Sequence, residues 1–170
     1  TLSSSSAASD VYKRQYFDQL AKLVDLDELC RAKLKVVVDS MYGTGAGYFK
    51  RLLDGGAIKL VEINSERNPL FPGIQPEPIA AHLAKLSATI KRGRANVGLA
   101  IDGDADRLGI MDEKGRFITQ LQIFALLALY MLEIRGERGP LVKTITATSM
   151  LYRLGEIFKV PVYETPVGFK

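Results

Sequence analysis

The sequence is poor in the side chains that most metal and cofactor sites use. Its 170 residues include one cysteine, Cys30, one histidine, His82, and no tryptophan. A single cysteine excludes an internal disulfide and is typical of a reducing compartment. A single histidine argues against a zinc site of the histidine–cysteine type, which needs three or four such ligands. The chemistry of this chain must therefore rest on carboxylates, arginine, lysine and backbone amides.

Long apolar runs and a strong charge are also missing. The longest apolar run, residues 123–132, is far shorter than the ~20 residues that span a bilayer, so we expect no membrane association. The net charge of +4 is small and dispersed, so it does not indicate a nucleic-acid partner. With 47% hydrophobic and 25% charged residues, the composition is that of a globular protein, which we expect in the cytoplasm.

The first fifteen residues show no hydrophobic periodicity. They are rich in serine and alanine and lack the apolar core of about 7–15 residues that a secretory signal requires. The string from Ser5 to Gln15 resembles the translation of an adapter used in sequencing libraries. We therefore expect residues 1–15 to be a non-native or disordered tail without fold or function.

From Tyr16 onward, helical and strand patterns alternate. Helical spacing predicts helices within 16–32, 48–53, 79–90, 120–134 and 151–158. Short β-branched or apolar runs predict strands at 35–39, 58–63, 97–101, 108–112, 141–145 and 160–163. This alternation predicts an α/β fold with a mixed, mainly parallel sheet and helices packed on it. We expect one such domain over residues 16–116 and a truncated second α/β domain over residues 117–170.

The most informative segment is the acidic loop Asp102-Gly103-Asp104-Ala105-Asp106-Arg107, which directly follows the expected strand at 97–101. Three carboxylates at alternate positions of a turn repel one another unless a cation neutralises them, so the loop predicts a hard-metal site. Arg107 adds a fork of donors that suits a phosphate beside the metal. The sequence therefore predicts a Mg²⁺ site next to a phosphate.

Two other interpretations of this loop remain open. An EF-hand also uses aspartate at positions 1, 3 and 5, and Glu113 falls at position 12, but position 6 holds Arg107 instead of glycine. An acidic surface turn without an ion is the second alternative. The glycine-rich turn at 43–47 has its own alternative, a dinucleotide fingerprint, which fails because Tyr48 occupies the place of the last glycine.

The acidic loop resembles the metal-binding loop of the α-D-phosphohexomutases, the phosphoglucomutase/phosphomannomutase family. Val37-Val38-Asp39 with the turn at 43–47 resembles the opening of that family's second domain, and residues 165–170 (TPVGFK) resemble the sugar-facing loop of its third domain. The resemblance implies domain II over 16–116 and the start of domain III over 117–170. It also implies an isomerase that interconverts hexose 1-phosphate and hexose 6-phosphate through a phosphoserine and a bisphosphate intermediate.

The resemblance assigns roles to two groups of residues. It implies that Mg²⁺ is held by Asp102, Asp104 and Asp106, with Arg107 as a catalytic residue beside the phosphoserine. It implies that the hexose phosphate substrate is contacted by Thr165, Val167, Gly168 and Lys170.

The family's serine loop, typically Thr-Ala-Ser-His-Asn-Pro, does not occur in this sequence. Residues 146–150 (TATSM) resemble it in part but lack the His-Asn-Pro that follows. We therefore interpret Tyr16 and Lys170 as truncated ends, expect the missing domains of the parent chain as partners, and expect this chain to be inactive alone. A non-catalytic α/β module that binds a metal or a phosphate remains the alternative.

Overall fold

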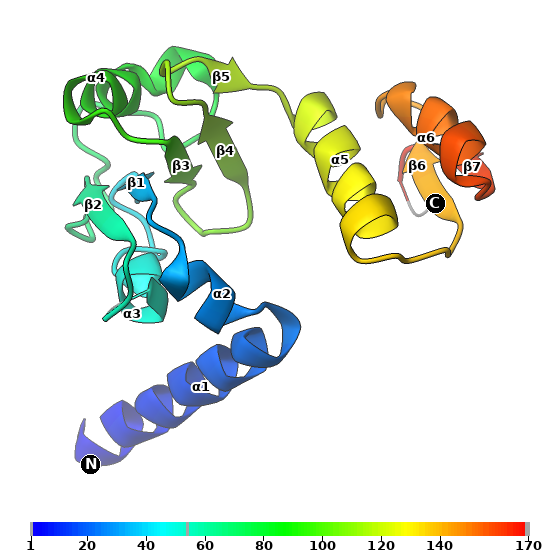
Figure 1. Ribbon diagram of the computed structural model, residues 1–170. Helices are drawn as coiled ribbons and strands as arrows, with labels where there is room; N and C mark the ends of the chain where they lie inside the picture. Colours follow the sequence, from blue (N-terminus) through cyan, green and yellow to red (C-terminus); the bar gives the residue numbers. More distant parts are fainter. Residues whose placement is uncertain (1, 54, 169–170) are drawn as a thin grey trace. The chain divides into compact units, whose positions relative to one another are not determined.

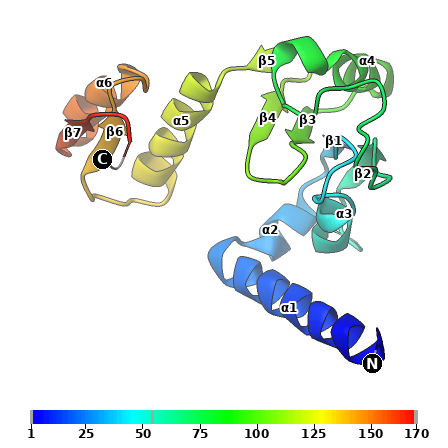
Figure 2. The same ribbon diagram turned by 180° about the vertical axis from the view of Figure 1, so that it is seen from behind.

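A computed structural model describes residues 2–53 and 55–168. The chain divides into two compact units, Thr1–Phe117 and Ile118–Lys170, whose elements are labelled in Figures 1 and 2. A five-stranded sheet lies in the first unit and a separate two-stranded sheet lies in the second. Both units combine strands with helices packed on them, and the sheet of the first unit is mixed, which confirms the predicted α/β class.

Residues 2–15, part of the segment predicted to be a non-native or disordered tail, are helical in the structure. Helix α1 runs over Leu2–Leu23, and its 22 residues contain neither glycine nor proline, so nothing in the chain interrupts the helix. Its carboxyl-terminal half is anchored, because the Phe17 ring lies 5.4 Å from the Tyr48 ring and the Arg51 guanidinium lies 4.5 Å from the Phe17 ring. A helix held at one end extends more readily than an isolated one.

The first unit is built on a mixed sheet in the order β2-β1-β3-β4-β5. Its strands are β1 (Lys35–Asp39), β2 (Lys59–Ile63), β3 (Val97–Ile101), β4 (Leu108–Met111) and β5 (Phe117–Ile118). Strand β1 pairs in parallel with β2 and β3, and β3 pairs antiparallel with β4. Strand β5 has two residues, too few to produce a recognisable alternation in the sequence.

Helices cover this sheet because alternate residues of β1 point to opposite faces. Its helices are α2 (Leu26–Arg31), α3 (Tyr48–Leu53), the 3₁₀ turn η1 (Ala80–His82) and α4 (Ala84–Gly93). One buried cluster joins Val37 to Leu86 and Ile90 of α4. A second cluster joins Val36 and Val38 to Phe49 of α3. The sheet is therefore sandwiched, and its carboxyl end carries the acidic loop.

The second unit is a βαβ arrangement packed on a preceding helix. It contains α5 (Gln120–Leu129), the π-helix η2 (Tyr130–Ile134), β6 (Leu141–Thr144), α6 (Met150–Phe158) and β7 (Val162–Thr165). Strands β6 and β7 are parallel, and the core consists of Ala128, Leu132, Leu151, Leu154 and Val160. No helix within the described ranges is both long enough and apolar enough to cross a membrane.

The last strand begins two residues later than the sequence predicts. Lys159 ends α6 in the left-handed conformation, with φ of 56°, and the Val160 N–H donates to the Gly155 carbonyl. Residue 161 is a proline, which has no N–H to donate to a sheet. The strand therefore starts at Val162 instead of Val160.

Candidate metal centre

The acidic loop joins two antiparallel strands, β3 and β4. Ile101 and Leu108 pair across the sheet, and the Asp102 N–H donates to the Arg107 carbonyl at 3.3 Å, so the loop is closed at its base. Ala105 takes φ of 64°, a left-handed conformation that L-residues rarely adopt outside tight turns. This turn brings the alternate side chains of the loop together.

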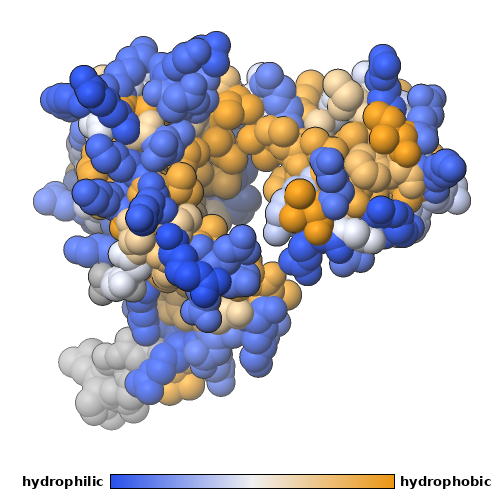
Figure 3. Space-filling model, in the orientation of Figure 1, coloured by the Kyte–Doolittle hydropathy of each residue, from blue (hydrophilic) through white to orange (hydrophobic). Residues whose placement is uncertain are grey.

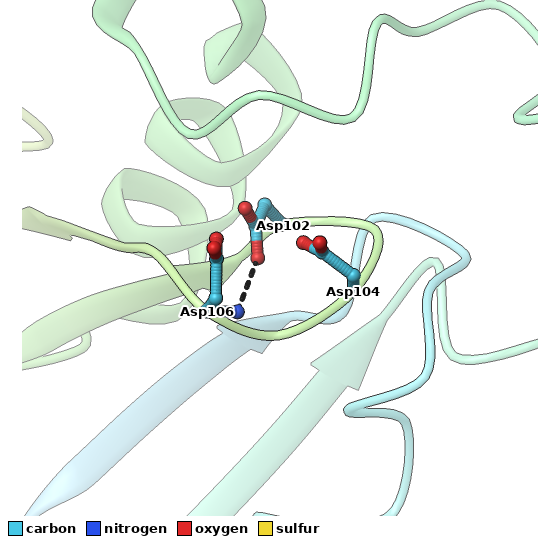
Figure 4. Close-up of side chains that lie close together, drawn as sticks. All are labelled: Asp102, Asp104 and Asp106. Carbon is cyan, nitrogen blue, oxygen red and sulfur yellow. Dashed lines mark hydrogen bonds between the residues drawn. The ribbon is translucent and has the colours of Figure 1, made fainter.

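The three aspartates converge as Figure 4 shows. One carboxylate oxygen from each of Asp102, Asp104 and Asp106 lies within 4.8 Å of the other two. Asp102 is fully buried, whereas Asp104 and Asp106 are exposed. The group therefore has one fixed member at the sheet and two members that can turn toward an incoming ion.

Asp102 organises the loop with both of its oxygens. Its Oδ1 accepts the N–H groups of Asp106 at 2.9 Å and of Arg107 at 3.1 Å. Its Oδ2 accepts from Nε of Arg107 at 2.8 Å. A buried carboxylate without such partners would be strongly destabilising, so these hydrogen bonds explain how a charged group is placed at the end of a buried strand.

Arg107 is held in place by three carboxylates. Besides Asp102, its Nη1 lies 3.0 Å from Glu77 Oε1, and its Nε lies 3.5 Å from Asp106 Oδ1. Its side chain is 57% exposed, so the guanidinium is both oriented and accessible to a ligand. Glu77 was missed in the sequence because it lies 30 residues away, in a proline-rich segment with no sign of pairing.

The pKa values of the aspartates in the loop reflect how close their charges lie to one another. Burial acts to raise the pKa of Asp102, but hydrogen bonds from Arg107 and Asp106 outweigh it and hold that pKa below its usual value. The pKa of Asp106 is raised by its side-chain contact with Asp102 and then by the negative charge of Asp104. When carboxylates share one site, their pKa values typically move apart in this way, and a cation bound between them relieves the repulsion.

Two neighbouring segments support the loop from outside. The Thr44 N–H donates to the Gly103 carbonyl at 3.0 Å, and the Gly103 N–H donates to the Pro76 carbonyl at 3.3 Å. A Cβ on Gly43 would lie only 2.7 Å from that same Gly103 oxygen. The glycine-rich turn therefore serves close packing against the acidic loop.

The donor set fits Mg²⁺. All three groups are hard carboxylate oxygens, the ligand type that Mg²⁺ and Ca²⁺ select. Three protein oxygens leave the other octahedral positions of Mg²⁺ to water or to phosphate oxygens. An EF-hand is excluded, because strands flank the loop on both sides and Glu113 follows β4.

The residues expected to contact the sugar lie in the second unit, apart from the acidic loop in the chain. Thr165 is the last residue of β7. Val167 is 64% exposed, and Gly168 takes φ of 95°, with no atom within 4 Å of the position that a Cβ would occupy. Lys170 lies outside the described residues.

Family models match nearly the whole patterned part of the chain. Residues 14–115 match the phosphoglucomutase/phosphomannomutase α/β/α domain II, and residues 120–170 match domain III of the same family. The phosphoglucomutase/phosphomannomutase of Thermococcus kodakarensis is 34% identical over 155 residues, which cover 91% of this chain and 34% of that protein. The chain therefore spans about a third of the length of this curated relative.

Solved structures agree with these matches. A Thermus thermophilus protein assigned as a phosphomannomutase is 38% identical, with a TM-score of 0.83, and the match covers 91% of this chain and 36% of that one. A phosphoglucomutase/phosphomannomutase family protein from Burkholderia thailandensis is 28% identical, with a TM-score of 0.72, and the match covers 79% of this chain and 30% of that one. The chain belongs to the phosphoglucomutase/phosphomannomutase family, and its two units correspond to domains II and III.

Proposed function

We propose that this chain is the metal-binding portion of a magnesium-dependent phosphohexomutase, which interconverts hexose 1-phosphate and hexose 6-phosphate through a phosphoserine and a bisphosphate intermediate. The observation that carries the proposal is the convergence of three carboxylates within 4.8 Å at the end of β3, beside the oriented guanidinium of Arg107. The names of the relatives, such as phosphoglucomutase/phosphomannomutase, support a hexose phosphate as substrate. The unpaired Cys30 supports a cytoplasmic location.

The roles divide between charge neutralisation and orientation. Bound to Asp102, Asp104 and Asp106, Mg²⁺ would neutralise charge on phosphate oxygens, which is the main requirement of phosphoryl transfer. Asp102 and Glu77 orient the guanidinium of Arg107 through Nε and Nη1. A guanidinium has five N–H donors in a fixed fork, so its exposed side can bind a phosphoryl oxygen while the other donors keep their protein partners.

The turn after β7 is proposed to bind the hexose. Gly168 has no Cβ and lies in open space, so a ligand can approach its backbone closely. Thr165 offers a hydroxyl at the carboxyl end of a parallel strand, the edge at which α/β folds bind ligands. Val167 presents an exposed apolar side chain in the same turn. The contact of Lys170 with the hexose phosphate is proposed from the sequence alone.

Metal binding can be tested on this chain directly. Asp104→Asn removes one of three negative charges, so we expect the Mg²⁺ affinity measured by calorimetry or NMR to fall at least about tenfold. Asp112→Asn is the matched control, since Asp112 pairs with Arg116 in the next turn and not with the acidic loop. Equal Mg²⁺ affinity in wild type and Asp104→Asn would contradict the metal assignment.

Catalysis is proposed to need the remaining domains. The phosphoryl-carrying serine loop does not occur in the sequence, so the chain alone should not turn over. The test is a coupled assay with glucose 1-phosphate, a trace of glucose 1,6-bisphosphate and Mg²⁺. Formation of glucose 6-phosphate at a rate proportional to the concentration of the chain would contradict this expectation. A longer parent protein that binds Mg²⁺ but shows no turnover would favour a non-catalytic binding module.

A further inference from the structure

The second unit contains a buried cation that the proposed chemistry does not use. The side chain of Lys143 on β6 is 3% exposed and forms an ion pair with Glu164 on β7. The two residues are direct partners in the register of the parallel pair. Tyr152 of α6 completes the group, because its hydroxyl donates to Glu164 Oε2 at 2.8 Å and its ring centroid lies 4.9 Å from the Lys143 ammonium. We call Lys143, Tyr152 and Glu164 the lysine cluster.

The lysine cluster lies where the core of this unit ends. Two residues earlier on the same face, Leu141 and Val162 pack against the apolar core, so the interior changes from apolar to ionic at the carboxyl ends of β6 and β7. The Lys143 side chain is buried while that of Glu164 is 38% exposed, and burying a charged side chain, even a paired one, rarely stabilises a protein more than an apolar side chain of similar size would. Stability alone is therefore a weak reason to place a lysine at this position.

The lysine cluster lies directly before the turn that follows β7. Glu164 directly precedes Thr165, and the Lys143 carbonyl accepts from the Thr165 hydroxyl at 3.4 Å. On the other side, the Ile145 N–H donates to the Thr165 carbonyl at 3.1 Å. The side chain of Lys143 thus holds residue 164, and its backbone holds residue 165. Thr165 ends β7, and the chain leaves the sheet directly after these two anchored residues.

We propose that Lys143 and Tyr152 are positioning residues that, by holding Glu164, set the backbone of residues 165–168 in the conformation that receives the hexose phosphate. The sugar contact itself rests on the proposed function, whereas the positioning of the turn does not. The ion pair persists at neutral pH, because the hydrogen bond to Glu164 raises the pKa of Lys143 against the effect of burial, and the same bond lowers the pKa of Glu164.

Amide hydrogen exchange of the whole chain, followed by NMR, tests the positioning role. In Lys143→Met we expect the amide of Ile145, which donates to the Thr165 carbonyl, and the amide of Thr165 on β7 to exchange at least about tenfold faster, because local opening at the base of the turn becomes easier. Lys143→Arg keeps the charge and should restore the slow exchange. Arg153→Met on α6 is the matched control, because Arg153 is exposed and outside the cluster.

Tyr152→Phe keeps the experiment decisive if Lys143→Met unfolds the second unit. It removes only the hydroxyl that donates to Glu164, so it should accelerate exchange at Ile145 and Thr165 while the amides of Leu154 and Gly155 inside α6 keep their protection. Unchanged exchange at Ile145 and Thr165 in Tyr152→Phe, or equal acceleration throughout the unit, would overturn the proposal.

A titration with glucose 1-phosphate separates this inference from the proposed function. Wild type should show amide shifts at Val167 and Gly168 that Lys143→Met loses and Lys143→Arg retains, while the Mg²⁺ affinity of the acidic loop stays the same in all three. Wild type without such shifts would contradict the sugar contact, and the exchange rates would still decide the positioning role.

Discussion

At the scale of single residues, the acidic loop depends on close contacts that a side chain would block. Gly43 is the clearest example, because a Cβ there would lie 2.7 to 2.8 Å from backbone atoms of Asp102 and Gly103. Backbone cannot move aside as a flexible side chain can. The position of the three carboxylates therefore depends on a glycine about 60 residues earlier in the chain.

Gly43→Ala should destabilise the first unit by about 1–3 kcal/mol, the usual range for overpacking a tight site. It should also weaken Mg²⁺ binding, because the backbone of Asp102 must shift. Urea unfolding and a Mg²⁺ titration measure the two effects. Gly139→Ala serves as the control, since a Cβ there meets no atom within 4 Å. An unchanged stability and metal affinity in Gly43→Ala would show that the loop is not packed against this turn.

Asp112 illustrates a second kind of residue-scale effect, in the turn between β4 and β5. Its carboxylate accepts from the Arg116 N–H at 2.8 Å, the Arg116 Nε at 2.7 Å and the Lys114 N–H at 3.0 Å. These hydrogen bonds lower the pKa of Asp112 in the folded chain, although desolvation acts in the opposite direction.

The sign of the pH dependence follows from this lowered pKa. The stabilisation by Asp112 is present above the pKa of the unfolded chain, about 4, and is lost as the pH falls through the lower folded value. Asp112→Asn should therefore reduce the melting temperature at pH 7 and leave it closer to that of wild type at pH 3. A difference between the two proteins that is the same at both pH values would rule out this linkage.

At the scale of elements, helix ends account for much of what the pattern could locate. Helix α5 begins at the predicted residue, 120, because Thr119 and Gln122 form a capping box in which each side chain accepts the backbone N–H of the other. Helix α4 begins later than expected, at Ala84, because Leu83 precedes it without a side-chain cap and the 3₁₀ turn η1 occupies the predicted start.

Thr119→Ala removes the hydroxyl that accepts from the Gln122 N–H and should reduce the stability of the second unit by about 1 kcal/mol. Thr119→Ser retains the hydroxyl and should stay within a few tenths of a kcal/mol of wild type. Chemical denaturation followed by the circular dichroism of the helices measures both. A loss in Thr119→Ser as large as in Thr119→Ala would mean that the methyl group, and not the cap, is responsible.

At the scale of the whole molecule, the second unit exposes much apolar surface. Figure 3 shows hydrophobic residues gathered over α5, where Leu126 is 55% and Leu127 57% exposed, and Ile134 of the following η2 is 70% exposed. Contiguous apolar surface of this kind usually marks an interaction site or an aggregation liability. The two-stranded parallel sheet of this unit also covers little of the surface of the helices in the unit.

We expect the isolated chain to self-associate through this surface. Sedimentation velocity at increasing concentration should show dimers or larger species, and the double variant Leu126→Glu/Leu127→Glu should shift the chain toward monomer. Leu70→Glu is the control, because Leu70 is 86% exposed but belongs to the first unit. Wild type that remains monomeric at all concentrations would exclude this role for the α5 surface.

Local sequence alone was enough to predict much of the protein. Short β-branched or apolar runs located all the strands except β5, and the run from Asp102 to Arg107 predicted its own convergence, since a six-residue loop between paired strands can close in few ways. The sequence showed no sign of the helix over residues 2–15, because serine and alanine tolerate helix and no nearby signal showed that Phe17 and Tyr48 would anchor it.

The contacts between distant segments were decided by the tertiary structure alone. The pairing of Arg107 with Glu77, the packing of Gly43 on Gly103 and the burial of Lys143 against Glu164 each join residues at least 21 positions apart. A lysine or a glutamate on a strand is ordinarily exposed, and its sequence neighbours do not reveal a partner across the sheet. Such pairs form only when the chain closes on itself, whereas the charge and spacing of the acidic loop are properties of six consecutive residues.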